Sequence, residues 1–386
     1  MFYNNSVTAL ETLKYLTSQM HLEPAEDAGC PQLSPKHQDD IHISHAMLPN
    51  GRQIKLLKSL LTSACERNCY YCPFRAGRDF RRATFKPEDF AQTFMALHQA
   101  GAVEGLFISS GILNGGIATQ DKLIAAAEIL RKKYQFKGYI HLKIMPGAER
   151  AQVEAAMRLA DRVSVNLEAP NTLRLEKLAP RKQFLEELLQ PLRWIEEIRR
   201  SQPSRLGWNG RWPSSVTQFV VGAVGENDLE LLQTTTYLYQ QLRLRRAYYS
   251  RFSPIRDTPF ENQPAESQLR ENRLYQASFL LRDYGFNLED MPFDATGNLP
   301  RHADPKKAWA DMHLANHPLE INRSSREELL RIPGIGPKSV DAILKARRST
   351  KLNDLDDLRK IGVNPSRAAP YILLDGRRPA YQSQLF

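Results

Sequence analysis

The sequence has few cysteines and no long hydrophobic run, and each shortage excludes a class of protein. Only four of its 386 residues are cysteine, too few for the disulfide framework of a small secreted domain. No stretch of eighteen apolar residues occurs, so the sequence predicts no membrane-spanning helix. The first residues carry neither a basic stretch nor an apolar core, so we expect no secretory signal and a cytoplasmic protein.

Acidic residues are also in deficit, and the excess of basic ones is unevenly spread. The chain has 53 Lys and Arg against 43 Asp and Glu, a net charge of +10 and a pI of about 9.4. Residues 1–50 hold two basic and six acidic side chains, whereas residues 320–386 hold thirteen and eight. This balance fits a polyanionic partner such as nucleic acid without identifying one.

Strand-like and helix-like patterns alternate between residues 51 and 284. The runs that predict strands are 54–61, 105–109, 139–144, 163–167, 216–221 and 247–251. The patterns that predict helices are 87–99, 120–133, 149–160, 183–200, 227–242 and 265–284. Parallel neighbouring strands need a crossover connection, so this alternation predicts an α/β fold built from parallel βαβ units.

The remaining segments flank this central region of residues 51–284. Residues 1–50 predict a short helix followed by an irregular arm, and residues 285–319 are a Pro- and Asp-rich connector without periodicity. Residues 320–376 predict a small all-helical unit, and residues 377–386 form a tail. The apolar stripe expected on the first helix consists of Leu10, Leu13, Leu16 and Met20.

Three of the four cysteines cluster just after the first predicted strand. Cys65, Cys69 and Cys72 have the spacing C-x3-C-x2-C, at the strand end where parallel α/β folds place their chemistry. Three thiolates can bind three irons of a [4Fe–4S] cluster and leave the fourth iron open. The alternative is a zinc site completed by a histidine, although structural zinc sites usually pair two C-x2–4-C knuckles. Cys30 lies apart, and we expect it to be dispensable.

This spacing, with the aromatic Tyr71 just before the third cysteine, resembles the signature of the radical S-adenosylmethionine (SAM) superfamily. The resemblance implies a partial (β/α)6 barrel, which agrees with the six-fold alternation, and a [4Fe–4S] cluster and SAM as cofactors. It also implies that SAM chelates the open iron. An electron from a low-potential donor such as flavodoxin or ferredoxin would then cleave SAM to a 5′-deoxyadenosyl radical, which abstracts hydrogen from a substrate.

Two further segments match the superfamily's SAM-binding motifs in part. Ser109, Ser110 and Gly111 occupy the place of a GGE-like segment but lack its glutamate, so backbone carbonyls would bind the methionine amino group. Alternate polar residues on the fourth predicted strand face the barrel interior, where the resemblance suggests ribose or carboxylate contacts. The alternative is a set of satisfied interior polar groups. These residues are Ser164, Asn166 and Glu168.

The last two predicted strands also end in segments that resemble SAM-binding motifs. Gly222, Gly225 and Glu226 match a degenerate adenine-side GxIxGxxE motif, and the alternative is an ordinary tight βα turn. The segment that ends with Ser253 resembles the one whose backbone flanks the adenine.

A segment near the C-terminus resembles a helix-hairpin-helix motif. Pro333 is expected to end one helix, and Pro337 occupies a favoured first position of the next. Between them, Gly334 and Gly336 are both expected to adopt positive φ, which allows a tight hairpin. The free amides of the second helix and the side chain of Lys338 would then point at a phosphate.

A degenerate copy of the motif follows at residues 357–374, so the resemblance implies a doubled DNA-binding unit. Ser325 is expected to cap the first helix of the first copy. Contacts of this kind hold the backbone of DNA without reading its bases. The alternative is a helical module that binds protein.

An arginine-rich stretch over residues 243–256 contains no acidic residue. Arg245 and Arg246 lie near the aromatic residues Tyr248, Tyr249 and Phe252, a mixture that suits phosphate contact and base stacking at the barrel mouth. The alternative is a charged, solvated face.

From about residue 50 the chain resembles the bacterial radical SAM proteins assigned to DNA modification or repair. It departs from them at residues 73–75 and 207–215, where substrate is expected to bind. We therefore expect a radical SAM enzyme that acts on DNA. A radical SAM enzyme that modifies RNA and a non-enzymatic DNA-binding iron–sulfur protein are the alternatives.

Overall fold

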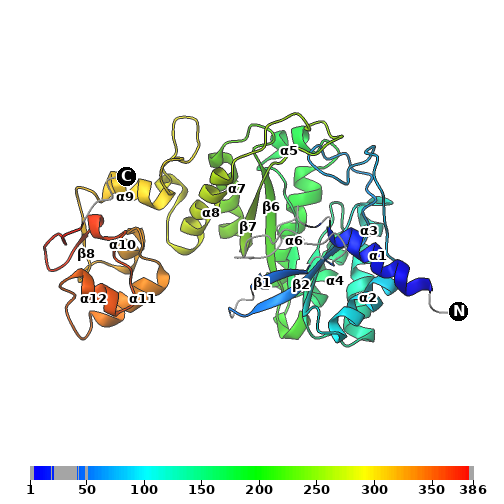
Figure 1. Ribbon diagram of the computed structural model, residues 1–386, viewed down its shortest axis with the longest axis horizontal. Helices are drawn as coiled ribbons and strands as arrows, with labels where there is room; N and C mark the ends of the chain where they lie inside the picture. The colour runs from blue at the N-terminus through cyan, green and yellow to red at the C-terminus, as the bar shows by residue number, and fades with distance from the viewer. Residues whose placement is uncertain (1–3, 19, 21–40, 42, 48–50, 382–386) are drawn as a thin grey trace. The chain divides into compact units, whose positions relative to one another are not determined.

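The computed structural model describes residues 4–18, 20, 41, 43–47 and 51–381. Its largest element is a curled, seven-stranded sheet whose strands follow one another in chain order (Figure 1). The strands are β1 (Ile43–Met47), β2 (Gln53–Leu60), β3 (Gly105–Ser109), β4 (Tyr139–Lys143), β5 (Arg162–Ser164), β6 (Ser214–Val221) and β7 (Arg246–Arg251). All neighbours from β2 to β7 are parallel. The predicted α/β half-barrel is therefore confirmed.

The first strand, β1, was not expected. It pairs antiparallel with β2, with Ile43 opposite Leu57, within the segment predicted to be an irregular arm. Only Ala46 of its five residues is buried, so the alternation that marks a half-buried strand is almost absent. The arm prediction is wrong for these residues, and most of the remaining arm, including Cys30, lies outside the described residues.

Helices pack beside the sheet, and the hydrophobic pattern found most of them. Pro87 begins α2 (Pro87–Gln99), as predicted, and α3 (Gly115–Glu128), α4 (Arg150–Leu159) and α6 (Gln190–Ser201) pack against one another in chain order (Figure 1). The helix α5 (Thr172–Leu178) was missed because its seven residues, about two turns, are too few to show a clear period. The helix α1 (Asn4–Ser18) contacts β2. Its predicted stripe is wrong at Leu10, which is 39% exposed, whereas Leu13, Leu16 and Met20 are buried.

The strand β5 is shorter than expected. The pattern predicted a strand to residue 167, but the ladder ends at Ser164. Glu168 then adopts a left-handed conformation with φ of 65°, which an extended strand does not contain. Its amide donates to the Gln218 carbonyl at 2.9 Å, and its carbonyl accepts from the Val220 amide at 2.8 Å. The chain thus leaves the regular β5 ladder after Ser164, but the backbone of Glu168 is still hydrogen-bonded to β6.

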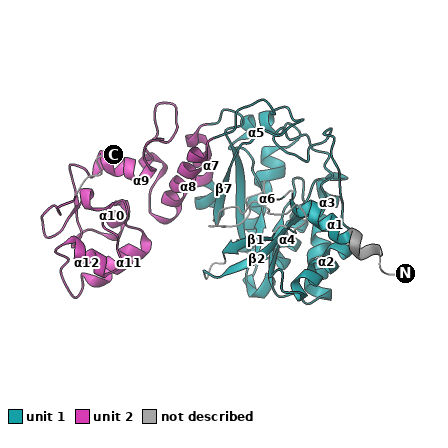
Figure 2. Cartoon of the chain, in the orientation of Figure 1, with its two compact units in different colours: residues 1–226, 237–266 teal, residues 227–236, 267–386 magenta. Residues whose placement is uncertain are grey.

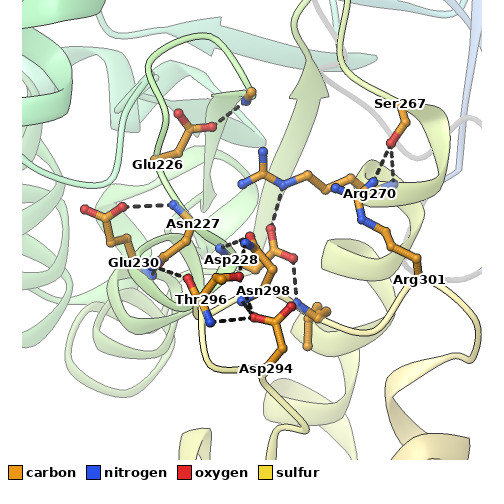
Figure 3. Close-up of polar contacts among 12 residues, drawn as sticks. Glu226, Asn227, Asp228, Glu230, Ser267, Arg270, Asp294, Thr296, Asn298 and Arg301 are labelled. Atoms are coloured by element: carbon orange, nitrogen blue, oxygen red, sulfur yellow. Dashed lines mark hydrogen bonds and ion pairs between the residues drawn. The ribbon is translucent and has the colours of Figure 1, made fainter.

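The chain divides into two units, residues 1–226 with 237–266 and residues 227–236 with 267–386 (Figure 2). The second unit contains α8 (Gln268–Asp283) and the first part of α7 (Asp228–Leu242), joined by a buried ion pair of 2.7 Å between Arg270 and Asp228. The other Asp228 oxygen accepts from the Leu299 amide at 2.9 Å, and Figure 3 shows this network. The segment predicted as a connector is therefore held in place.

The rest of the second unit is built on one hydrophobic cluster. Its elements are β8 (Leu319–Glu320), α9 (Pro305–His313), α10 (Arg326–Arg331), α11 (Pro337–Ala346), α12 (Leu355–Lys360) and β9 (Ile372–Leu373). The unit is helical as expected, and it also contains a short parallel pair of β8 and β9, of two residues each, which was not predicted. The helix α9 also lies inside the supposed connector. Ser325 caps α10 as predicted, through a capping box with Glu328.

The second hairpin copy is incomplete. Its first helix is α12, but only the 3₁₀ turn Ala369–Tyr371 stands where a second helix was expected. Pro365 and Pro370 interrupt this stretch, and proline removes amide donors that a helix interior needs.

Candidate functional site

The cysteine loop follows β2 and is fixed by backbone hydrogen bonds. Cys69 is buried, and Cys65 and Cys72 are partly buried. The Cys65 sulfur accepts from the amides of Arg67 and Ile112, both at 3.4 Å, and the Cys72 sulfur accepts from the Phe74 amide at 3.4 Å. Burial raises the pKa of the Cys69 and Cys72 thiols. A bound cation would offset this cost, because metal ligation deprotonates thiols.

The three cysteines line one cavity together with the ends of the parallel strands. The predicted cofactor residues on its wall are Tyr71, Ser109, Ser110, Gly111, Asn166, Glu168 and Ser253. They come from loops that follow β2, β3, β5 and β7, which is the arrangement expected at the carboxyl edge of a parallel sheet. The structure therefore brings together residues that are almost 190 positions apart in the sequence.

Four predicted cofactor residues lie outside the wall of this cavity. Ser164 is buried below it, and its hydroxyl has no hydrogen-bond partner among the described residues. Gly222 and Gly225 adopt positive φ and form a tight turn. The Glu226 carboxylate accepts from the Gly222 amide, as Figure 3 shows, and from the Val224 amide at 3.2 Å. Glu226 thus stabilises a tight βα turn, which the sequence analysis gave as the alternative to an adenine-binding motif.

The end of β3 approaches the cysteine loop too closely for any side chain at Gly111. A Cβ atom there would lie 2.2 Å from the Ala64 carbonyl oxygen and 3.2 Å from the Cβ of Cys65. The neighbouring Ser110 hydroxyl lines the cavity and is buried without a partner in the part of the chain that the structure describes. The site therefore has a backbone without a side chain and a buried hydroxyl without a partner among the residues described, both next to three thiols. This arrangement fits a site that binds a cofactor.

A buried ion pair lies beside the cysteines. The Lys182 ammonium is 3.0 Å from a carboxylate oxygen of Glu168, and both side chains are less than 10% exposed. Burial lowers the pKa of Lys182, but the negative charges of the Cys69 thiolate and Glu168 outweigh this and hold the pKa above its usual value. Burial, followed by the charge of Glu168, raises the pKa of Tyr71 well above its usual range.

Sequence reasoning missed several cavity residues. Lys143 lies on β4 and Gln218 lies on β6, and both line the cavity. Each is a polar residue in a largely apolar strand, and this pattern could have been used to predict them as site residues. Lys182 follows α5 in an irregular segment, so no pattern marked it. Arg67 and Arg251 also line the cavity.

The first part of the arginine-rich stretch does not lie at the barrel mouth as predicted, whereas Arg251, at the end of β7, lines the cavity. Arg246 begins β7 and pairs with Val216 at the amino end of β6, and the Arg245 amide donates to Ser215. The cavity lies at the opposite, carboxyl ends of these strands, about 17 Å away at 3.3 Å per residue. The aromatic residues offered for base stacking are buried in the core, and they are Tyr248, Tyr249 and Phe252.

The hairpin before α11 has the predicted shape with one difference. Gly334 adopts φ of 82°, as expected, but Gly336 is the N-cap of α11 with φ of −109°, so its predicted positive φ is wrong. Lys338 is exposed in the first turn of α11. The Lys306 ammonium donates to the Ile335 carbonyl at 2.6 Å, which fixes the middle of the hairpin from below.

The described residues contain neither a compact group of side chains for a single metal ion nor a membrane-spanning helix. No three side chains of His, Cys, Asp or Glu lie close enough there to share one metal ion. A zinc site needs all its ligands within about 2.3 Å of one ion, whereas each cysteine of a four-iron cluster binds a different iron. None of the described helices is both long and apolar enough to cross a bilayer.

Comparison with known proteins gives the class of this fold. The model of the radical SAM superfamily matches residues 59–238, and the helix-hairpin-helix model matches residues 319–346. No curated protein matches the chain. Similar solved structures include methylornithine synthase (PylB), with 15% identity and a TM-score of 0.46 over 59% of this chain and 62% of that one. Another is the FeFe-hydrogenase maturase HydG from Carboxydothermus hydrogenoformans, with 16% identity and a TM-score of 0.45 over 59% and 51%.

The part of the chain that matches the radical SAM superfamily model holds the cysteine loop and the strands β3 to β6 of the half-barrel. The chain thus contains a radical SAM domain followed by a helix-hairpin-helix motif. Members of the radical SAM superfamily use a [4Fe–4S] cluster and SAM, and the residues around the cavity fit both. The chain spans about three fifths of the length of the methylornithine synthase structure.

Proposed function

We propose that this protein is a radical SAM enzyme that modifies or repairs DNA. One observation carries the proposal: the three cysteines open into a cavity at the carboxyl ends of the parallel strands, in a chain that also carries a helix-hairpin-helix motif. The first feature supports cofactor chemistry, and the second supports a nucleic-acid substrate. The two features occupy different units of the chain.

The cavity residues would divide the cofactors among them. Cys65, Cys69 and Cys72 would bind three irons, and the backbone around Ser110 would accept hydrogen bonds from the SAM amino group. Glu168 would contact the ribose or stay with Lys182 as a fixed pair. When bound, the cluster and SAM supply one-electron chemistry that removes a hydrogen atom from a substrate.

The protein's own contribution is positioning and the exclusion of water. Strand ends on the cavity wall hold Asn166 against Gln218 at 3.4 Å, and the Glu168 backbone is fixed by two hydrogen bonds to β6. Glu168 keeps a strained left-handed conformation, which persists only where surrounding structure enforces it and which is frequent at functional sites. A rigid wall keeps the reacting groups in one geometry.

The hairpin would hold the phosphate backbone of DNA. The amides that begin α11 and the exposed Lys338 would contact one phosphate, which positions DNA without reading its sequence. A base buried in a duplex cannot reach the cavity, so the reaction requires a flipped or unpaired nucleotide.

The cluster assignment is tested by single replacements in the cysteine loop. We expect Cys65→Ala, Cys69→Ala or Cys72→Ala to abolish iron binding after anaerobic reconstitution, as measured by iron content and absorbance. The matched control Cys30→Ala is expected to retain the wild-type iron content. Stoichiometric zinc without iron, or loss of the cluster in the control, would show that the site has been misread.

The substrate assignment is tested by anaerobic reaction with SAM, a reductant and damaged or undamaged DNA, followed by mass spectrometry of nucleosides. We expect 5′-deoxyadenosine together with a changed deoxynucleoside. A changed ribonucleoside with RNA, and none with DNA, would assign the enzyme to RNA. An iron–sulfur protein that binds DNA but never cleaves SAM would be non-enzymatic.

A further inference from the structure

Several arginines lie on segments that also contribute to the cavity wall, and all of them except Arg256 are at positions that the sequence did not single out. The three segments are the loop after Cys72, the segment before Lys182 and the segment after β7. Each segment contributes residues to the cavity wall, among them Phe74, Lys182 and Ile255. We call this group the arginine collar, and it consists of Arg75, Arg78, Arg81, Arg181 and Arg256.

The collar has almost no acidic partners. Within the described part of the chain, the first four of its arginines form no ion pair, and Arg256 lies 4.0 Å from Asp257. That pair is highly exposed, so it contributes little. By contrast, the cavity-lining Arg67 is neutralised by Glu187. The collar thus carries positive charge that ion pairs scarcely offset, on segments that also line the cavity.

The loop that carries most of the collar is held firmly. Arg82 donates to the carbonyls of Ser63, Phe74, Arg75 and Arg78, at 2.8 to 3.2 Å. Its guanidinium also lies 4.0 Å from the centre of the Phe80 ring. Arg78 donates to the carbonyls of Pro73 and Arg256, both at 2.9 Å, and so joins the first segment to the third. The Arg78 side chain and the backbone that carries Arg75 and Arg81 are therefore pre-positioned, which lowers the entropy cost of binding a ligand.

An aromatic side chain stands at the inner edge of the collar. Phe74 is partly buried and lines the cavity, and its ring lies 6.1 Å from that of Phe80. Cationic side chains that follow a phosphate backbone, combined with aromatic faces for the bases, are the usual design for binding a single strand of nucleic acid. An acidic redox protein would need the same charge but has no use for an aromatic side chain inside the cavity.

We infer that the strand carrying the reacting nucleotide crosses the arginine collar, with its phosphates on the collar and one nucleotide entering the cavity past Phe74. This inference rests on the proposed function, since it takes DNA as the substrate. It replaces Arg245 and Arg246, which lie at the far ends of the strands, as the nucleic-acid contact of the barrel.

The test is the salt dependence of binding to a short fluorescein-labelled single-stranded DNA, measured by anisotropy on the full-length protein. The variant is Arg81→Gln with Arg181→Gln and Arg256→Gln, because these three side chains are exposed and the variant keeps Arg78 and Arg82, which hold the loop after Cys72. Arg181 donates to the Glu66 carbonyl at 3.3 Å, and glutamine retains an N–H donor there. Each lost phosphate contact reduces the log–log slope by about 0.7 for a single strand, so we expect a slope shallower by about 2. The control Lys122→Gln with Lys132→Gln and Lys137→Gln removes the same charge from exposed positions of the α3 side, and we expect its slope to equal that of the wild type.

The outcomes separate this inference from the proposed function. A wild-type protein that binds and alters DNA, with a collar variant of unchanged slope, would overturn the collar alone. An equal loss of slope in the lysine control would also overturn it, since it would reveal a general charge effect. Slower reduction by an acidic one-electron donor, with DNA binding unchanged, would assign the collar to that protein instead. A wild-type protein without affinity for DNA would refute both proposals. Thermal unfolding and iron content verify that each variant is folded.

Discussion

At the scale of single residues, the pair of Glu168 and Lys182 is the least expected part of the site. Removing one partner from a buried pair leaves the other charge uncompensated, which costs about 3 kcal/mol or more. Glu168 therefore has a structural role in addition to any contact with SAM.

We accordingly expect Glu168→Gln to destabilise the iron-free protein by about 3 kcal/mol, as measured by urea unfolding. The double variant Glu168→Gln with Lys182→Met removes both charges and should be clearly more stable than the single variant. Equal stability of the single variant and the wild type, with SAM cleavage lost, would instead make Glu168 a cofactor contact without a structural role.

Site residues could be predicted from the sequence where they stand at a regular spacing from one another. The cysteines and the Ser109–Gly111 segment stand in short local patterns, and Asn166 and Glu168 alternate along one predicted strand. Lys182 belongs to no periodic element, and its partner is determined only when two distant segments fold together. Arg245 and Arg246 were misplaced although they precede the predicted strand 247–251, because chemistry in a parallel sheet lies at the carboxyl ends of the strands.

At the scale of the element, the two hairpin glycines have different tasks. Gly334 has φ of 82°, and a Cβ there would also lie 3.0 Å from the Cβ of Arg367. Gly336 has an ordinary φ, and a Cβ there would meet only the hydroxyl tip of Tyr284, at 3.1 Å. A side chain at Gly334 is therefore strained by the backbone itself, whereas Tyr284 can move slightly away from one at Gly336.

We expect Gly334→Ala to destabilise the hairpin by about 1–2 kcal/mol and Gly336→Ala to cost clearly less. Hydrogen–deuterium exchange of peptides from residues 326–346 measures this locally. Lys338→Glu should weaken DNA binding about equally for all sequences while exchange in the hairpin stays unchanged. Equal destabilisation by the two alanines would show that the φ of Gly334 is not the cause.

The hairpin should also respond to pH through Lys306. Burial lowers the pKa of this lysine to about 7 from its ordinary value near 10.5, despite the nearby charge of Asp304. Between these two values the unfolded chain binds more protons than the folded one, so stability rises with pH. The contribution is fully present above pH 10.5 and is lost as the pH falls to about 7. We expect thermal midpoints of the second unit to increase from pH 7 to pH 10, and Lys306→Met to flatten that increase. An unchanged slope in the variant would show that another group is responsible.

At the scale of the whole molecule, the order of the barrel strands follows from the alternation of strands and helices, because parallel neighbours need a crossover. The missed elements are short or lack a period: β1 is half exposed, α5 has seven residues, and β8 and β9 have two each. Such short elements are stabilised by packing against their neighbours, so their own residues show no periodic hydrophobic pattern from which they could be predicted. The boundary between the units runs through α7, so no change of composition marks it.

The second unit shows where the chain can be cut. Its hydrophobic cluster joins Ala310 and Leu314, at and just beyond the end of α9, to the hairpin residues Ile332, Ile335 and Val340. A chain that ends at residue 319, the boundary that the sequence predicts, would keep α9 and expose its apolar face. A chain that ends at residue 303 removes α9 together with its partners in the hydrophobic cluster and uncovers only the part of α8 that α9 contacts.

We therefore expect the chain of residues 1–319 to bind more of a hydrophobic dye, and to unfold at a lower temperature, than the chain of residues 1–303. Because the cysteine loop and its cavity belong to the first unit, residues 1–303 should bind as much iron as the full chain. Their affinity for duplex DNA should fall, with a shallower salt slope, since the hairpin phosphate contact is gone. If residues 1–303 instead bind duplex DNA as tightly as the full chain does, the helix-hairpin-helix binds a protein partner. The contact with DNA would then rest on the arginine collar alone.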